Sequence, residues 1–168
     1  IFQGLMFVII ALLGVGLVIR RTPQETAKRL GLELPTPQNV IIGVIAGFLL
    51  IGVASVLTQV WLSLVTPEQY AQQTAAAAEI SNQITTVQAV FVLSLTAALS
   101  EEILFRGALQ PVFGLPLTTV FFVTFHDQYT LSPAMLVILS VGLGLALLRR
   151  YQSTTSAIIA HFIYNFVP

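Results

Sequence analysis

Three charged residues stand inside a stretch of the sequence that is otherwise apolar. The segment LSEEILFRGALQ, residues 99–110, places Glu101, Glu102 and Arg106 in a run long enough to cross a membrane. A charge in the hydrocarbon layer costs roughly 2.5 to 3.5 kcal/mol on insertion scales, so such residues face a protein interior or a water-filled cavity. Glu102 and Arg106 are four residues apart with the acid first, which favours a helical ion pair. Glu101 points about 100° away on the same helix and is left without a basic partner.

The two histidines of the chain also lie in apolar segments. His126 ends the run FFVTFH, and His161 stands four residues before Asn165 in HFIYN. A single intramembrane histidine is usually a hydrogen-bonded core residue. Two histidines, an amide and a pair of adjacent carboxylates at similar depth predict one polar cavity, which we expect to be built from three helices and open to the inner side of the membrane.

Carboxylate, imidazole and amide groups in such a cavity suit the activation of water and the stabilisation of an oxyanion, which is the chemistry of acyl-bond hydrolysis. The chain has no cysteine, one aspartate (Asp127) and no His-Glu-x-x-His sequence. These counts exclude a cysteine nucleophile, an aspartyl dyad and the common zinc-protease motif. They do not exclude a serine–histidine dyad, because Ser94 and Ser100 lie near the acidic pair, although neither stands in a Gly-x-Ser context.

The elements that must position these groups are membrane helices. Of 168 residues, 56% are hydrophobic and 8% are charged, and the mean hydropathy is +0.90. This composition predicts an all-α, polytopic transmembrane bundle. We expect about six spanning helices, at residues 2–19, 40–65, 87–110, 117–129, 131–148 and 155–167. The third and fourth are separated by three helix-breaking residues, Pro111, Gly114 and Pro116.

Three parts follow along the chain. Residues 1–65 are expected to form two helices joined by a basic loop, residues 66–86 a connecting segment with a short surface helix, and residues 87–168 the core. All seven lysines and arginines lie in or near the loops after the first, third and fifth helices, so these loops are predicted to be cytoplasmic. The numbers of acidic and basic residues are equal, so the chain has no net positive charge that would favour binding to nucleic acid.

Three motifs occur in a fixed order along the core, and together they resemble those of the CPBP family, the CAAX proteases and bacteriocin-processing enzymes also called Abi proteins. The resemblance covers residues 87–167, about half of the chain, and implies the helical core of type II CAAX prenyl endopeptidases. The motifs as they stand here are Glu101-Glu102-x-x-x-Arg106, Phe122-x-x-x-His126 and His161-x-x-x-Asn165.

The resemblance also implies a role for each motif residue. Glu101 and His126 would together activate the attacking water, and His161 and Asn165 would form the oxyanion hole. The ion pair of the first motif would hold the catalytic carboxylate and its helix in place. These roles agree with the proton-accepting and hydrogen-donating abilities of the residue types.

The sequence therefore predicts an intramembrane endopeptidase that contacts membrane lipid and cleaves a membrane-associated peptide or protein, lipidated or not, reached from the cytoplasmic side. Two alternatives stay open. One is a catalytically silent scaffold or assembly subunit of a larger membrane complex. The other is a transporter with a Glu101–His126 proton relay, which is disfavoured because the chain shows no inverted repeat. No cofactor is expected; zinc held by Glu101, His126 and His161 is the less favoured alternative, because these residues are scattered over three helices.

Overall fold

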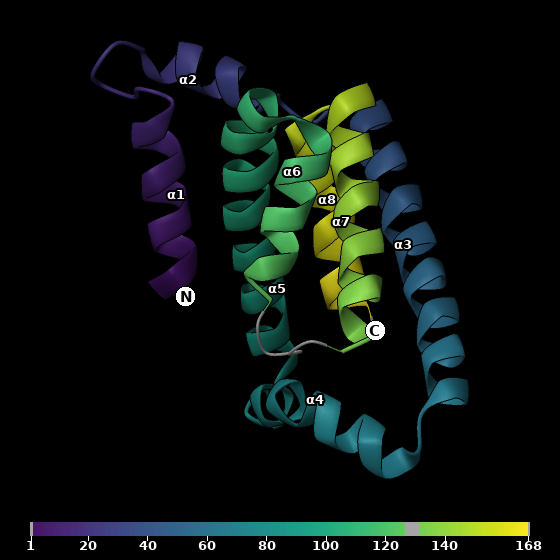
Figure 1. Cartoon of the computed structure of the whole chain (residues 1–168). Coiled ribbons are helices and arrows are strands. Elements are labelled where there is room, and N and C mark those ends of the chain that lie inside the picture. The colour runs from purple at the N-terminus through teal and green to yellow at the C-terminus, as the bar shows by residue number, and fades with distance from the viewer. Residues whose placement is uncertain (1, 127–131, 168) are drawn as a thin grey trace.

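The chain folds into helices joined by short turns (Figure 1). A computed structural model describes residues 2–126 and 132–167. The predicted all-α class is confirmed. Asp127, the predicted helix end at Tyr129 and the predicted helix start at Leu131 lie outside the described residues, as do Ile1 and Pro168. The helices are α1 Phe2–Gly14, α2 Pro23–Leu30, α3 Pro37–Leu64, α4 Pro67–Asn82, α5 Val87–Glu101, η1 Glu102–Leu109, α6 Gln110–Thr124, α7 Ala134–Tyr151 and α8 Thr154–Phe166.

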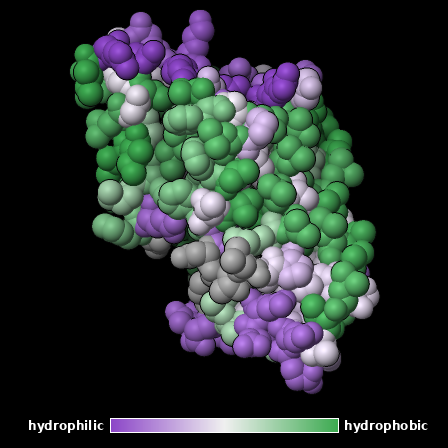
Figure 2. All heavy atoms as spheres, viewed as in Figure 1, coloured by the Kyte–Doolittle hydropathy of each residue, from purple (hydrophilic) through white to green (hydrophobic). Residues whose placement is uncertain are grey.

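Three helical stretches of the described chain are long and apolar enough to cross a membrane. They are α3, the continuous stretch Val87–Thr124 and α7, with hydropathies of 2.8, 1.5 and 1.6. Apolar side chains cover the middle of the face seen in Figure 2, and hydrophilic side chains gather at the α2 end and the α4 end. This distribution is typical of a multi-pass membrane protein.

The first predicted helix is shorter than expected. It ends at Gly14 rather than Ile19, because Gly16 (φ 92°) and Val18 (φ 56°) both adopt left-handed backbone conformations that end a right-handed helix. The 13 residues of α1 rise about 20 Å. The turn that follows brings the basic residues Arg20 and Arg21 back toward the end of α1.

The interruption predicted between Pro111 and Pro116 is confirmed at Gly114. This residue has φ 77° and ψ 168°, a conformation that L side chains rarely adopt, and it divides the stretch from Val87 to Thr124 into two arms. The second arm, residues 115–124 of α6, runs back along η1, and α6 also packs against α7 (Figure 1). The reversal places residues near the end of α6 beside the end of α5.

Helix α2 was not predicted, because the polar segment around it reads as a loop. Its local signal is a capping box, in which the Thr22 side chain accepts from the Glu25 backbone and the Glu25 carboxylate accepts from the Thr22 backbone at 2.8 Å. The hydrogen bonds that this carboxylate accepts from the Thr22 backbone N–H and from the Thr22 hydroxyl lower the pKa of Glu25. The helix ends with Leu30 wholly buried, and its carbonyl accepts from Thr154 Oγ1 at 2.6 Å. Helix α2 is thereby fastened to the start of α8.

Two apolar clusters form the core. The first, the α1/α6 cluster, contains Phe7, Leu30, Phe105 and Phe122 among its members, and the second, the α3/α7 cluster, contains Leu50, Val141, Leu145 and Ala160. Helix α5 with η1 lies on one side and α3 on the other, with α6, α7 and α8 between them (Figure 1). Side chains that stand between the two clusters are therefore shielded from lipid.

Glycines allow α3 to approach α8 closely. A Cβ atom at Gly43 would lie 2.8 Å from Ile159 Cβ, and one at Gly47 would lie 2.7 Å from Ile163 Cβ and 2.9 Å from the Ala160 carbonyl. The spacing of the two glycines is the small-xxx-small pattern that lets membrane helices pack backbone to backbone. The position of α8 therefore depends on these glycines.

Gly47→Leu is expected to lower the free energy of unfolding by about 1–3 kcal/mol, because the added side chain meets backbone that cannot move aside easily. Gly52→Leu is the matched control: a Cβ at Gly52 meets nothing within 4 Å. The measurement is unfolding of both variants in the same detergent. Equal stability of the two variants would contradict close packing at Gly47.

Candidate active site

The acidic pair lies at the junction of α5 and η1. Residues 102–109 form a π-helix, in which the Gln110 N–H donates to the Phe105 carbonyl, five residues earlier. The sequence pattern predicted an ordinary α-helix here, because a π segment of this kind has no hydropathy signature. Such segments are rare and often occur at functional sites.

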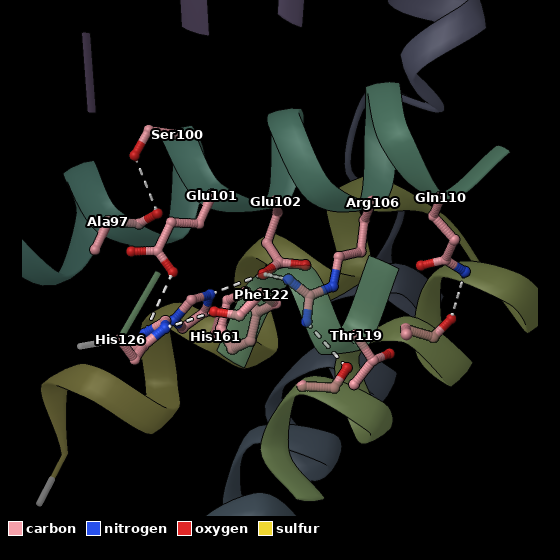
Figure 3. A network of polar contacts seen from close by, with 12 residues as sticks. Ala97, Ser100, Glu101, Glu102, Arg106, Gln110, Thr119, Phe122, His126 and His161 are labelled. Carbon is pink, nitrogen blue, oxygen red and sulfur yellow. Dashed lines mark hydrogen bonds and ion pairs between the residues drawn. The ribbon is translucent and has the colours of Figure 1, made fainter. Parts of the chain in front are cut away.

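Glu102 is the centre of a buried polar network (Figure 3). Its Oε1 lies 3.2 Å from Arg106 Nη1, which confirms the predicted ion pair, and 2.8 Å from His161 Nδ1. Arg106 Nη2 also donates to the Gly142 carbonyl at 3.0 Å. The carboxylate and the guanidinium are 0% and 1% exposed, so the pair is fully shielded from lipid. The contact between Glu102 and His161 was not predicted, because it joins residues on different helices with no pattern linking them.

Phe122 packs at the middle of this network. Its ring lies 4.2 Å below the Arg106 guanidinium carbon and 5.3 Å, edge to face, from the ring of Phe105. Both contacts are favourable for an aromatic ring with a negative face. The sequence motif included Phe122, but only the structure shows that its ring supports the buried arginine.

The carbonyl of Phe122 also orients His126. It lies 2.9 Å from His126 Nδ1, and because a carbonyl only accepts, Nδ1 carries the hydrogen. In the neutral ring the lone pair is then on Nε2. Figure 3 shows this nitrogen directed at Glu101, whose Oε2 lies 3.9 Å away. The i, i+4 spacing of the second motif thus sets both the tautomer and the direction of the histidine.

The four residues predicted to be catalytic line one cavity of 230 Å³. It lies where the two apolar clusters meet, since Phe122 belongs to the first and Val141 to the second. Sequence patterns gave no reason to include the aliphatic and tyrosine side chains of its wall. The lining residues are Glu101, Phe122, His126, Ile138, Val141, His161, Tyr164 and Asn165.

A larger groove of 630 Å³ adjoins this cavity, and the two share Ile138, Tyr164 and Asn165. Its other walls come from α3, α4 and α7, and they carry uncharged polar side chains such as Ser55 and Thr58. The groove reaches α4, at the end of the molecule opposite to the basic helix α2 (Figure 1). The sequence had predicted an opening at the basic end; the reversal of α6 instead brings His126 toward α4.

The serines near the acidic pair do not form a dyad with a histidine. Ser100 Oγ donates to the Ala97 carbonyl of its own helix at 3.3 Å (Figure 3). Ser94 is buried, and neither serine has a hydrogen bond to a histidine within the described residues. This geometry favours water over serine as the nucleophile.

The zinc alternative requires Glu101, His126 and His161 to converge on one ion. In the part of the chain that the structure describes, no three His, Asp or Glu side chains are grouped as a metal site. His161 Nδ1 is engaged by Glu102 and His126 Nδ1 by a backbone carbonyl, which leaves Nε2 of each ring as the nitrogen that could ligate. We therefore assign no step of the chemistry to a metal.

Comparison with known proteins supports the resemblance seen in the motifs. The family model described as type II CAAX prenyl endopeptidase Rce1-like matches residues 83–167, which include every polar residue of the cavity. No curated protein and no solved structure matches the chain. The matched region is half of the chain and spans α5 to α8. The chain therefore belongs to the Rce1-like family of type II CAAX prenyl endopeptidases.

Proposed function

We propose that this protein is an intramembrane endopeptidase that hydrolyses a peptide bond of a membrane-associated protein with water activated by Glu101 and His126. The observation that carries the proposal is the 3.9 Å separation of Glu101 Oε2 and His126 Nε2 on the wall of one cavity. That separation is longer than a direct hydrogen bond, but one water oxygen can reach both atoms. Such a water donates one hydrogen to the carboxylate and the other to the Nε2 lone pair, which leaves its own lone pair free for attack.

The reaction follows general acid–base chemistry. The water oxygen bonds to the carbonyl carbon of the substrate while its proton moves to the Glu101 carboxylate, and the carbonyl oxygen becomes an oxyanion. When the tetrahedral intermediate collapses, the carbon–nitrogen bond breaks and the amine takes the proton back from this acid–base pair. The products are a carboxylate and an amine, and no other reactant is required.

The oxyanion is stabilised by His161 and Asn165. The Asn165 amide is a hydrogen donor on the cavity wall. His161 gives its Nδ1–H to Glu102, so its Nε2 can donate to the oxyanion only when both ring nitrogens carry a hydrogen. Glu102 thus serves two groups, since it neutralises Arg106 and orients His161.

The substrate reaches the cavity along the adjoining groove. The groove has neither acidic nor basic side chains among its lining residues, and its hydroxyl and amide groups suit the backbone of an extended peptide. The distribution of basic residues supports an orientation with the α2 end in the cytoplasm and the α4 end on the opposite side. We further propose that α1, α5 with η1, α6 and α8 cross the membrane with α3 and α7, giving six crossings, and that residues 1–65, 66–86 and 87–168 form the N-terminal pair, the connection and the catalytic core.

Cleavage of peptides by the reconstituted protein tests this function. We expect proteoliposomes containing the chain to cleave quenched-fluorescence peptides, and His126→Gln to lower the rate by about 10²- to 10⁴-fold, the usual contribution of a general acid–base group. Peptides with and without a farnesylated cysteine separate lipidated from unmodified substrates. Absence of cleavage across the set, with a folded protein, would favour a scaffold instead.

Treatment with a chelator is expected to leave the cleavage rate unchanged, because no three His, Asp or Glu side chains of the described residues are grouped as a metal site. The measurement is the rate before and after dialysis against 1,10-phenanthroline, with metal content determined in parallel. Loss of cleavage that is restored by zinc would contradict the metal-free mechanism.

A further inference from the structure

We propose that a second cavity, at the basic end of the molecule, binds an anionic phospholipid. This cavity has a volume of 330 Å³ and lies between α1, η1 and the first turn of α6. It shares no lining residue with the cavity of the catalytic residues, so the proposal does not depend on the peptidase function. One half of the cavity has an apolar wall, and the other half is a mouth lined by three arginines.

The apolar half is open toward the lipid. Ile10 of α1 and Val112 and Phe113 of α6 line the cavity, yet they are 52%, 65% and 48% exposed. The inner wall is formed by Leu104 and Ala108, which are buried. An acyl chain that enters sideways from the bilayer therefore meets apolar side chains on every face, as a hydrocarbon chain requires.

The mouth of the cavity is strongly basic. Arg20, Arg21 and Arg29 line it, and none of them forms an ion pair within the described residues. The nearby carboxylate of Glu25 is held by the backbone and hydroxyl of Thr22, at 2.8 and 2.9 Å. The mouth thus carries an excess of positive charge, which Glu25 offsets only in part through its attraction to Arg21, and an anionic phosphate would lower the remaining repulsion.

The turn after α1 holds two of these arginines in place. At Gly16, with φ 92°, a Cβ would lie 2.8 Å from Arg20 Cγ, so the arginine stem packs directly on the glycine. Arg21 Nη1 donates to the carbonyl of Val15, the residue before that glycine. The third arginine, Arg29, donates from Nη1 to the Gly107 carbonyl of η1 at 3.2 Å. The mouth is thus built by a specific turn and by α2, and it is connected to the helix that carries the catalytic network.

A phospholipid fits both halves at once. Guanidinium groups bind phosphate oxygens in paired hydrogen bonds, and basic pockets between membrane helices on the positively charged side bind anionic headgroups. A free phosphate ion would bind the arginines of the mouth but would make no contact with the apolar wall. A neutral phospholipid would contact the apolar wall but would leave the positive charge of the arginines uncompensated.

The first experiment compares headgroups. The full chain, purified in a neutral detergent, is titrated with phosphatidylglycerol or with phosphatidylcholine of the same acyl chains, and the melting temperature and bound lipid by native mass spectrometry are recorded. We expect phosphatidylglycerol to raise the melting temperature by about 5 °C or more near saturation and phosphatidylcholine to leave it unchanged. Equal effects of the two lipids would overturn the proposal.

The second experiment tests each half of the site. Arg20→Gln with Arg21→Gln should remove most of the shift, whereas Arg150→Gln, which lies at the same end but outside this cavity, should keep it. Gly14→Leu should also remove the shift by occupying the apolar half. A Cβ at Gly14 meets nothing within 4 Å, so this variant is expected to fold, and Gly52→Leu is its control for the same reason.

The source of the phosphate is decided by a third titration, with inorganic phosphate alone. A shift as large as that of phosphatidylglycerol, retained in Gly14→Leu, would show a free-anion site and overturn the lipid assignment. An undiminished lipid shift in the double arginine variant would overturn it as well. Loss of the lipid shift in both cavity variants, with both controls unchanged, would support it.

Discussion

Glu101→Gln is expected to lower the rate of peptide hydrolysis by about 10²- to 10⁴-fold without loss of stability. The amide of glutamine has almost the shape of the carboxylate but cannot accept a proton from water. Glu101 Oε2 has no hydrogen-bond partner within the described residues, so the substitution breaks no hydrogen bond of that atom. Oε2 itself is buried, but the side chain as a whole is 18% exposed and lines the cavity, which is large enough to hold a water molecule.

The measurement is the initial cleavage rate in proteoliposomes, with the melting temperature of the same preparation. Glu79→Gln is the matched control, because Glu79 is an exposed carboxylate on α4 and does not line either the cavity or the groove. Unchanged cleavage by Glu101→Gln would refute water activation by this residue. Full retention of fold with loss of cleavage would separate an enzyme from a scaffold that uses the acidic pair for packing.

Glu102→Gln, unlike Glu101→Gln, is expected to cause a large loss of stability. Its carboxylate is the ion-pair partner of Arg106 and the hydrogen-bond acceptor of His161, and it is 0% exposed. Without it the guanidinium stays buried and uncompensated, which typically costs about 3–5 kcal/mol. We also expect cleavage to fall, because His161 loses the group that orients it.

A double substitution separates these two effects. Glu102→Leu with Arg106→Met removes both charges and replaces them with apolar groups of similar size, which is often neutral or stabilising for a buried pair. The double variant is therefore expected to recover most of the stability lost in the single variant while remaining inactive. The free energy of unfolding is measured with denaturant for the wild type, the two corresponding single variants and the double variant. Recovery of activity together with stability would mean that Glu102 acts only on packing.

Much of the architecture could be predicted from the sequence because the bilayer limits the choices. Long apolar runs must be helical in lipid, so the sequence located α3, α7 and the stretch Val87–Thr124 within a few residues. Gly114 and the prolines on either side of it predicted the reversal, because glycine can adopt a backbone conformation that ends a helix and proline disrupts helical hydrogen bonds. The early end of α1 was missed, because the backbone of Gly16 and Val18 ends the helix inside an apolar run.

The chemical groups of the candidate site were also predictable from sequence, since only a few ionisable residues lie inside apolar segments and all three motifs have helical spacing. The ion pair of Glu102 with Arg106 and the face shared by His161 and Asn165 depend on contacts within a single helix. Helical geometry alone determines such contacts.

Only the tertiary structure decided which groups meet across helices. The contact of His161 with Glu102, the direction of His126 toward Glu101 and the ring of Phe122 under Arg106 all depend on how the helices pack. That packing follows from close glycine contacts, from the reversal of α6 and from a π segment, none of which has a hydropathy signal. The sequence by itself predicted the residues of the candidate site and the helices that carry them; the packing of those helices decided which residues meet across helices and the end at which the groove lies.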